Sequence, residues 1–277
     1  MRKEANNNHR CQAGPRGSHR RSEQAFTMVE IALSLAVVAF ALVAIIGVLP
    51  LGMTVQKDNR EDTLMNQEGR YWLEAIKSGA SGLHDLTNYV EEIRITSNPS
   101  NRPPALVIVN NTEPYLTGSE IISLLSIAKH EFIAGRLVTN RITARVRAIT
   151  GPATDQSPFT NTVQSTFRYE LQSELVPVRP LPDGFVARLM QDDTNNLPTL
   201  LFNEAMATNL WDVRLILRWP VVERGNGWFV GNSRKTFRAR VSGELLVATN
   251  TNPQKINNDD RALRRFAPNQ FNVAGLQ

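Results

Sequence analysis

The feature of this sequence that most constrains its fold is a long apolar run close to the start of the chain. From Ile31 to Leu49 there are 19 residues without a charged side chain, and Ser34 is the only polar interruption. A helix from Phe26 to Leu49 would be about 36 Å long at 1.5 Å per residue, which is enough to cross the hydrocarbon core of a bilayer. The sequence therefore predicts a transmembrane helix over residues 26–50.

The residues before this run are strongly basic. Six of the 31 Lys and Arg residues lie within residues 1–25, together with two of the 26 Asp and Glu residues. A basic flank stays on the cytoplasmic side of a membrane, so we expect a cytoplasmic N-terminus and a body on the far side. The remaining residues hold 25 bases and 24 acids. This near-neutral balance argues against nucleic acid as a partner of the body, because nucleic acid attracts strongly basic surfaces.

A removable secretory signal and a retained anchor are the alternatives for such a run. Ala39-Phe-Ala41 has the letters of a signal cleavage site but lies inside the apolar run, which ends in Val48-Leu-Pro-Leu-Gly-Met53 without a polar stretch. Glu30 is also unusual for a signal, because an unpaired carboxylate at the bilayer centre costs about 2.5–3.5 kcal/mol. These features favour a retained helix whose carboxylate needs a partner.

The start of the apolar run resembles a known leader. Ala25-Phe-Thr-Met-Val-Glu30, followed by the apolar run, is similar to the class III leader of type IV pilins and type II secretion pseudopilins, in which Gly precedes Phe-Thr-Leu-Ile/Val-Glu. The resemblance implies that residues 1–25 are a cytoplasmic leader, that a prepilin peptidase cuts between Ala25 and Phe26, and that the new amine of Phe26 is methylated. Ala25 stands where the family usually has Gly.

The resemblance also implies a fold, a location and partners. Pilin-like proteins are α+β, with a long N-terminal helix packed on an antiparallel β-sheet; its membrane-spanning half would be residues 26–50 and its amphipathic half residues 51–82. Such proteins sit in the inner membrane with a periplasmic body, here residues 83–277. They then join other pilin or pseudopilin subunits in a pilus or pseudopilus, on an inner-membrane assembly platform. Leu217-Arg-Trp-Pro220 is further similar to the late strands of minor pilins of the V and I types.

Glu30 has a physical reason to act in assembly. It lies four residues after Phe26, so a new N-terminal amine and this carboxylate can share one face of the helix. The pair can close within one chain or between chains. Docking against the amine of a neighbouring subunit would relieve the buried charge, so we expect lateral association of these helices.

Beyond the apolar run the pattern changes. Gly47, Pro50 and Gly52 are expected to kink or break the helix, since Pro removes a backbone donor. Apolar residues then recur at three- and four-residue spacing until a Gly-rich stretch at residues 78–82. From residue 83, alternating and β-branched runs predict an antiparallel sheet. We expect strands at residues 89–96, 105–109, 136–149, 167–178, 211–222 and 236–247, a helix at 119–129, extended or loop segments at 176–184 and 191–199, and a mobile tail at 250–260.

The alternation is clearest at residues 211–222, where Val213, Leu215 and Leu217 are expected on one face and Asp212 and Arg214 on the other. Arg224-Gly-Asn-Gly227 follows and predicts a hairpin turn before Trp228.

Arginine outnumbers lysine by 25 to 6, and several arginines alternate along the predicted strands. Arg141 and six others are expected to share the sheet face away from the helix; the six are Arg145, Arg147, Arg214, Arg218, Arg238 and Arg240. One interpretation is an anion-binding face. The other, which the near-neutral body charge favours, is a face paired with acids of neighbouring strands or subunits.

The sequence indicates neither a catalytic site nor a metal or cofactor site. Cys11 is the only cysteine and lies in the leader, and the four His residues show no ligand spacing. Asp192-Asp193 and residues 258–260 offer oxygen ligands for calcium but follow no EF-hand pattern, so they are interpreted as solvated loops. We expect a structural subunit rather than an enzyme. The alternative is a single-span anchor for a periplasmic binding or enzymatic domain that does not polymerise.

Mass spectrometry of the purified protein tests the leader. We expect a mature N-terminus at Phe26 with a methylated α-amine, because the resemblance places the cut before Phe26. A product that keeps residues 1–25, or one that starts downstream of Leu49, would contradict this expectation.

Overall fold

The computed structural model of the protein describes residues 26–79, 84–98, 105–108, 116–133, 136–149, 167–191, 197–225, 227–247, 263–268 and 270–272. The chain divides into two compact units, Met1–Lys57 and Asp58–Gln277. Within the first unit the described residues are the start of a helix. The second unit, called the body below, carries the sheet and the hydrophobic core. The protein is therefore α+β, as predicted.

Helix α1 (Met28–Lys77) is continuous through Gly47, Pro50 and Gly52. Of the predicted kink or break at these residues, the break is therefore wrong. Proline fixes φ near −65°, which is a helical value, so the helix continues with the loss of one backbone hydrogen bond. The Oγ1 of Thr54 donates to the carbonyl of Pro50 at 3.0 Å. The helix ends at Lys77, and Gly79 follows with φ +66°, which agrees with the predicted Gly-rich stop.

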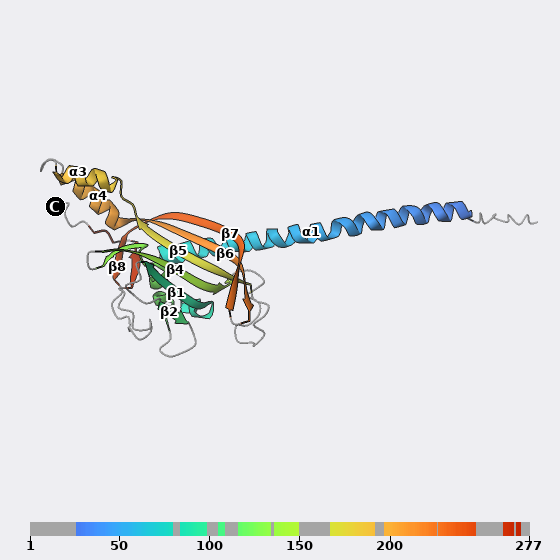
Figure 1. Ribbon diagram of the computed structural model, residues 1–277, viewed down its shortest axis with the longest axis horizontal. Helices are drawn as coiled ribbons and strands as arrows, with labels where there is room; N and C mark the ends of the chain where they lie inside the picture. The colour runs from blue at the N-terminus through green and yellow to red at the C-terminus, as the bar shows by residue number, and fades with distance from the viewer. Residues whose placement is uncertain are drawn as a thin grey trace, which may run out of the picture. The chain divides into compact units, whose positions relative to one another are not determined.

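The body is built on a seven-stranded antiparallel sheet with strand order β2-β1-β4-β5-β6-β7, in which β3 also pairs with β4 (Figure 1). A second sheet pairs β8 with β9. The strands are β1 (Val90–Asn98), β2 (Ala105–Ile108), β3 (His130–Ile133), β4 (Arg136–Arg147), β5 (Arg168–Pro177), β6 (Leu210–Arg224), β7 (Gly227–Ser242), β8 (Glu244–Val247) and β9 (Arg264–Ala267).

All six predicted strands are present, with shifted ends. The segment predicted as 236–247 is divided at Gly243 between β7 and β8, and β7 begins earlier, at Gly227. Strands β3 and β9 were not predicted. The predicted hairpin at residues 224–227 is confirmed, since Arg224 pairs with Gly227 and Gly225 has φ +57°.

The helices of the body differ more from the prediction. Helix α2 (Gly118–Leu125) is shorter than the predicted 119–129, because Ala128 already pairs with Leu175 in a β-bridge. Helices α3 (Asp183–Gln191) and α4 (Leu197–Asn209) were not predicted; α3 begins within the predicted extended segment 176–184, and α4 begins within the predicted loop 191–199. They follow the end of β5 and precede β6 (Figure 1). Prolines favour extended and loop structure. Here, however, Pro182 precedes α3 and Pro198 lies in the first turn of α4, where Pro is tolerated.

Within the body, the last part of α1 packs on one face of the sheet. Its buried apolar residues, Met65, Trp72, Ala75 and Ile76, belong to the same hydrophobic core as the inward residues of the central strands. On β6 these are Val213, Leu215 and Leu217, which confirms the predicted alternation with Asp212 and Arg214. Gly69 permits close approach, since a Cβ there would collide with the ring of Phe237. Among the described residues of the predicted amphipathic half, buried side chains begin at Met65 and alternate with exposed ones, whereas residues 51–60 are exposed throughout.

A buried carboxylate ties α1 to the sheet. Glu68 has no exposed surface, and its Oε2 accepts a 2.6 Å hydrogen bond from the hydroxyl of Tyr169 on β5. Its Oε1 accepts from the backbone N–H of Ile149 at 2.7 Å. The indole N–H of Trp72 donates to the same Tyr169 oxygen at 2.6 Å. Burial, and then the adjacent Glu68 carboxylate, raise the pKa of Tyr169 well above its usual value of 10.0.

Replacing Tyr169 tests this connection. Tyr169→Phe leaves the Glu68 carboxylate and the Trp72 N–H without this partner, so we expect the free energy of unfolding to fall by about 2–4 kcal/mol. Because the folded-state pKa of Tyr169 is raised, the wild type should keep this stabilisation below pH of about 10 and lose it as the pH rises further. Urea unfolding from pH 7 to 11 measures both effects.

Tyr71→Phe is the matched control. Tyr71 stands beside Trp72 but is only half-buried, and its ring meets Trp72 edge-on. Its hydroxyl can be removed with a change of within about 0.5 kcal/mol. Equal losses in the two variants would contradict a special role for Tyr169.

Candidate functional site

The first candidate site is the start of α1. Thr27 caps the helix, since its Oγ1 accepts a 3.3 Å hydrogen bond from the N–H of Glu30 and its carbonyl accepts from the N–H of Ile31. Glu30 lies in the first helical turn, where a negative charge is stabilised by the helix dipole. Phe26 and Glu30 are both exposed, and the carboxylate of Glu30 has no ion-pair partner among the described residues. Ala25 lies outside the described residues, as does the rest of the predicted leader.

The side chains that follow are apolar and exposed all round the helix. Every residue from 28 to 57 is exposed, including Val38, Phe40 and Leu49. α1 is long and apolar enough to cross a membrane, and its most apolar stretch is entirely unburied. A helix that is apolar on all sides needs an apolar environment, either a membrane or other helices. The predicted membrane-spanning capacity is thus confirmed.

The second candidate site is the sheet face away from α1, where the structure places the predicted arginines. Their positions alternate with buried residues such as Ala144 and Val146. Charged residues form a row across five strands: Glu92 lies opposite Arg145, Arg145 opposite Glu170, Glu170 opposite Arg218, and Arg218 opposite Arg234. Opposite charges at facing positions stabilise a sheet, and like charges destabilise it. Only the last of these facing pairs, Arg218 with Arg234, brings two like charges together.

Five of the six arginines proposed for anion binding are paired with acids. Arg145 and Arg147 contact Glu91, with Nε to carboxylate distances of 3.2 and 2.9 Å. The remaining pairs are Arg214 with Glu174 at 3.8 Å, Arg218 with Glu170 at 3.6 Å and Arg238 with Asp212 at 2.6 Å. Arg240 faces Asp212 across the strands and forms no ion pair within the described residues. The structure therefore supports cross-strand pairing over an open anion-binding face.

The Asp212–Arg238 pair shows how strongly this face depends on pairing. Both carboxylate oxygens of Asp212 accept from the Nε of Arg238, at 2.7 and 2.9 Å. These hydrogen bonds, more than any other contact, lower the pKa of Asp212 from its usual value. Its carboxylate therefore stays ionised to lower pH than an ordinary aspartate.

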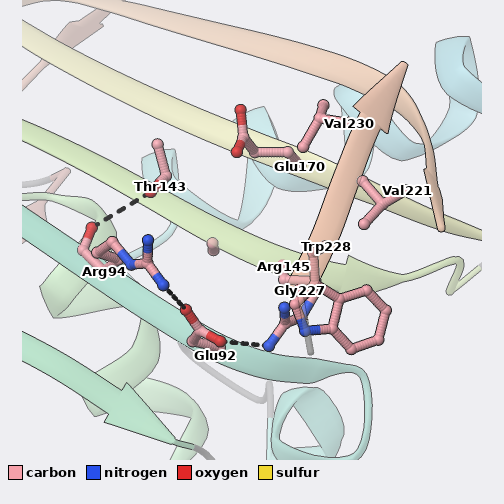
Figure 2. A pocket seen from close by; sticks show the side chains of 10 residues that line it. Glu92, Arg94, Thr143, Arg145, Glu170, Val221, Gly227, Trp228 and Val230 are labelled. Atoms are coloured by element: carbon pink, nitrogen blue, oxygen red, sulfur yellow. Dashed lines mark hydrogen bonds and ion pairs between the residues drawn. The ribbon is translucent and has the colours of Figure 1, made fainter. Parts of the chain in front are cut away.

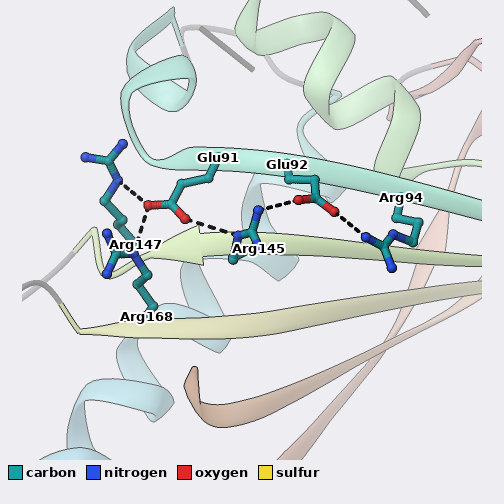
Figure 3. A network of polar contacts seen from close by, with 6 residues as sticks. All are labelled: Glu91, Glu92, Arg94, Arg145, Arg147 and Arg168. Carbon is teal, nitrogen blue, oxygen red and sulfur yellow. Dashed lines mark hydrogen bonds and ion pairs between the residues drawn. The ribbon is translucent and has the colours of Figure 1, made fainter. Parts of the chain in front are cut away.

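The densest part of this face lies at the start of β1 (Figure 3). Glu91 contacts three arginines: Arg145 and Arg147 form ion pairs with it, and the Nε of Arg168 donates a hydrogen bond to it at 2.9 Å. Glu92 accepts from Arg94 at 3.0 Å and from Arg145. A β-bulge between Val90 and Glu92 brings these two successive carboxylates to the same group of arginines. The six residues form one network, called the arginine network below.

The tip of the β6–β7 hairpin covers part of this network. The register of the two strands shifts between Trp219 and Val221, and the strands continue to the turn at residues 224–227. Gly231 allows a close approach at the shift, because a Cβ there would collide with the carbonyl of Trp219. The guanidinium of Arg145 lies 4.0 Å from the ring centre of Trp228, and that of Arg168 lies 5.4 Å away. These cation–π contacts hold the hairpin tip over the arginine network.

A cavity of about 350 Å³ lies beside Trp228 (Figure 2). Charged residues from β1, β4 and β5 line it on one side, and residues from the hairpin line it on the other. The lining residues include Glu92, Arg94, Arg145, Glu170, Val221 and Trp228. Small-ligand pockets span about 300–1,000 Å³, so this cavity is at the small end of that range.

Sequence reasoning missed the cavity and four of the six residues of the arginine network. Glu91, Glu92, Arg94 and Arg168 carry no motif, and Trp228 was assigned only to a hairpin. The available signal was the alternation of acids and arginines on strands that turned out to be neighbours. Strand order was needed to use it, because residues 92 and 145 meet only when β1 pairs with β4.

The structure does not describe every feature that the sequence predicts. The suggested oxygen ligands Asp192-Asp193 and residues 258–260 lie outside the described residues, as does the predicted tail. In the described part of the chain, no three His, Cys, Asp or Glu side chains are grouped so as to hold a metal ion. Comparison of the chain with family models, with curated proteins and with solved structures finds no match.

The role of Arg145 can be tested by substitution. Arg145→Leu removes a partner of Glu91 and Glu92 and the cation beneath Trp228, so we expect a loss of about 1–3 kcal/mol in unfolding free energy. The hairpin tip should also loosen, and acrylamide should quench Trp228 fluorescence more strongly. Arg240→Leu, on the same face but without an ion pair, should change stability by no more than about 0.5 kcal/mol. Equal quenching in the two variants would contradict this role.

Proposed function

We propose that the chain is a structural pilin-like subunit, either a minor type IV pilin of the V or I type or a type II secretion pseudopilin. It would enter a pilus or pseudopilus through its N-terminal helix after prepilin peptidase cleavage before Phe26. The observation that carries this proposal is the start of α1, where a helix with apolar side chains exposed on all sides has one carboxylate, Glu30, in its first turn.

The environment of Glu30 favours assembly over simple anchoring. An anchor needs only apolar residues, and a carboxylate within the bilayer costs about 2.5–3.5 kcal/mol when unpaired. None of the described residues of the chain provides a cation that pairs with Glu30. Cleavage before Phe26 would create an amine four residues away, and the amine of a neighbouring subunit would give the carboxylate a partner when helices pack side by side. The charge would then set the axial register between subunits.

The body supports a structural role in such a filament. The sheet-packed end of α1 is attached through apolar contacts and through the Glu68 hydrogen bonds. Two further contacts join α1 to the hairpin strands: the indole N–H of Trp219 donates to Glu61 at 3.1 Å, and Lys235 pairs with Asp62 at 2.6 Å. A subunit that is held by its helix must transmit force to its body, and this attachment provides the connection.

A second candidate function is a membrane-anchored binding domain that does not polymerise. The cavity beside Trp228 favours it, because a purely structural subunit does not require a lined pocket. The two functions differ in their dependence on Glu30. A binding domain needs the helix to stay in the membrane, whereas a filament subunit also needs the carboxylate.

Glu30→Ala separates the two. We expect the variant to reach the membrane at the wild-type level but to enter filaments at least about tenfold less, because it has no carboxylate to pair with the amine of a neighbouring subunit. Immunoblots of sheared filaments and of membranes from the same cells measure both quantities.

Two variants complete this experiment. Ser34→Ala removes a polar group from the same apolar run and should assemble normally. Glu30→Gln keeps the shape without the charge and should assemble as poorly as Glu30→Ala. Wild-type levels of Glu30→Ala in filaments would refute the role of Glu30 in assembly. Absence of the wild-type protein from the sheared filaments would refute the filament proposal and leave the anchored domain.

A further inference from the structure

Strand β7 forms one edge of the seven-stranded sheet. It pairs with β6 on one side, and no described strand pairs with its other side (Figure 1). Its pairing with β6 is regular over residues 233–242. Alternate residues of an edge strand direct their backbone N–H and C=O groups away from the sheet, where water or a strand of another chain can satisfy them. β7 is 16 residues long and contains no proline, so this edge can pair along its length.

The side chains of β7 divide between the two faces of the sheet. Lys235 pairs with Asp62 of α1 at 2.6 Å, so it faces the helix. Residues at the alternate positions lie on the opposite face. They include three exposed arginines, Arg234, Arg238 and Arg240, which are called the edge arginines below. Because β7 contains no acidic residue, its side-chain charges are all positive.

The rows of facing residues across the sheet show which charge is missing beyond β7. Two rows have the same order, with an acid on β5, an arginine on β6 and a second arginine on β7: these are Glu170, Arg218 and Arg234, and Glu174, Arg214 and Arg238. Like charges at facing positions destabilise a sheet. An acid on a further strand would face the last arginine of each row and restore the alternation of charge.

The charge near this edge is also unbalanced. On the face away from α1, the regularly paired parts of β6 and β7 carry five arginines and one acid, Asp212. Asp212 is already bound by Arg238, at 2.6–2.9 Å. Adding the two facing acids of β5 leaves five arginines against three acids. Arg234 and Arg240 form no ion pair within the described residues. A ligand of this edge would therefore carry acidic groups.

An acidic strand fits the edge better than other occupants. A second copy of β7 would bring the edge arginines of two chains together, and positive side chains on an edge oppose self-pairing in this way. A nucleic acid would contact the arginines but leave the outward backbone groups of β7 without strand partners. An acidic strand supplies carboxylates to the arginines and a complete set of backbone donors and acceptors to the edge.

We propose that β7 is the docking edge for an acidic strand of a different protein, which extends the sheet by antiparallel pairing. Opposite Arg240, Arg238 and Arg234, this strand carries acids at positions i, i+2 and i+6, because an antiparallel partner runs in the reverse direction. Its residues i+1 and i+3 are apolar, since they lie opposite Ala239 and Phe237 on the face toward α1. The proposal does not depend on filament assembly and holds for an anchored domain as well.

Binding of a synthetic peptide to the full-length protein in a non-ionic detergent tests the proposal. The peptide has blocked ends, glutamates at i, i+2 and i+6, and valine or threonine elsewhere, and a fluorophore on it reports binding by anisotropy. We expect saturable binding. The same peptide with glutamines at the three positions should bind at least about tenfold more weakly, because hydrogen bonds to charged groups are lost.

A third peptide separates strand pairing from attraction between charges. It keeps the three glutamates but has prolines at i+3 and i+4, of which one must direct its nitrogen toward β7. Proline has no backbone N–H and does not fit inside a ladder of strands. We therefore expect binding at least about tenfold weaker than that of the first peptide.

Variants locate the binding. Arg234→Gln combined with Arg240→Gln removes two edge arginines that have no ion pair within the described residues, so the fold should be kept and the affinity should fall about tenfold or more. Arg141→Gln is the matched control and should bind like the wild type. Arg141 is exposed on the same face but lies on β4, which is separated from β7 by β5 and β6. Circular dichroism identifies any variant that fails to fold.

Hydrogen exchange measures the backbone contribution in the wild type. Saturation with the first peptide should slow amide exchange within residues 233–242 by about tenfold or more, because the outward N–H groups gain partners. Peptides from residues 136–147 of β4 should exchange at an unchanged rate. This measurement needs no variant, so it decides the outcome even if the double variant does not fold.

Four results would overturn the proposal. The first is no saturable binding of the first peptide up to about 1 mM, which corresponds to a weak affinity. The second is unchanged exchange within residues 233–242 when the peptide is bound. The third is unchanged affinity in a folded double variant. The fourth is equal or tighter binding of the proline peptide, or displacement of the first peptide by an equal concentration of a single-stranded oligonucleotide, which would identify a general polyanion surface.

Discussion

The attachment of α1 to the sheet depends on one buried carboxylate. Glu68 lies within the apolar stripe of the helix, where an unpaired charge would be strongly destabilising. Its donors come from Tyr169 on β5 and from Ile149, just after β4. Two donors from separate segments specify both the rotation and the position of the helix on the sheet, which apolar contacts alone specify less sharply. Met65, Trp72 and the rest of the core are packed around this arrangement.

The two faces of the sheet follow different physical rules. The face toward α1 is apolar and gains stability from burial. The opposite face consists largely of facing acids and arginines, and it is organised by pairing across strands rather than by free charge. The tip of the β6–β7 hairpin combines apolar and charged contacts, because Trp228 places an aromatic ring on a charged surface. The cavity exists because that tip stands over the arginine network.

Sequence reasoning was accurate where a pattern is local. The apolar run, the Gly stop after Lys77, the alternation on β6 and the hairpin at residues 224–227 are all present. It failed where local rules compete. Gly47, Pro50 and Gly52 were expected to kink or break the helix, yet the helix continues through them, because the φ of Pro50 is compatible with a helix. Residues 176–184 and 191–199 were expected to be extended or irregular, although α3 begins in the first segment and α4 in the second.

The sequence by itself determined that one segment must enter an apolar environment, and that a single carboxylate near its start requires a partner. Both follow from the composition of consecutive residues and need no knowledge of the fold. Which acids neutralise the arginines was decided only by the tertiary structure. Glu91 and Arg168 are distant along the chain, and they meet because strand order and a β-bulge bring them together. The same long-range pairing left a cavity beside Trp228, for which no local pattern exists.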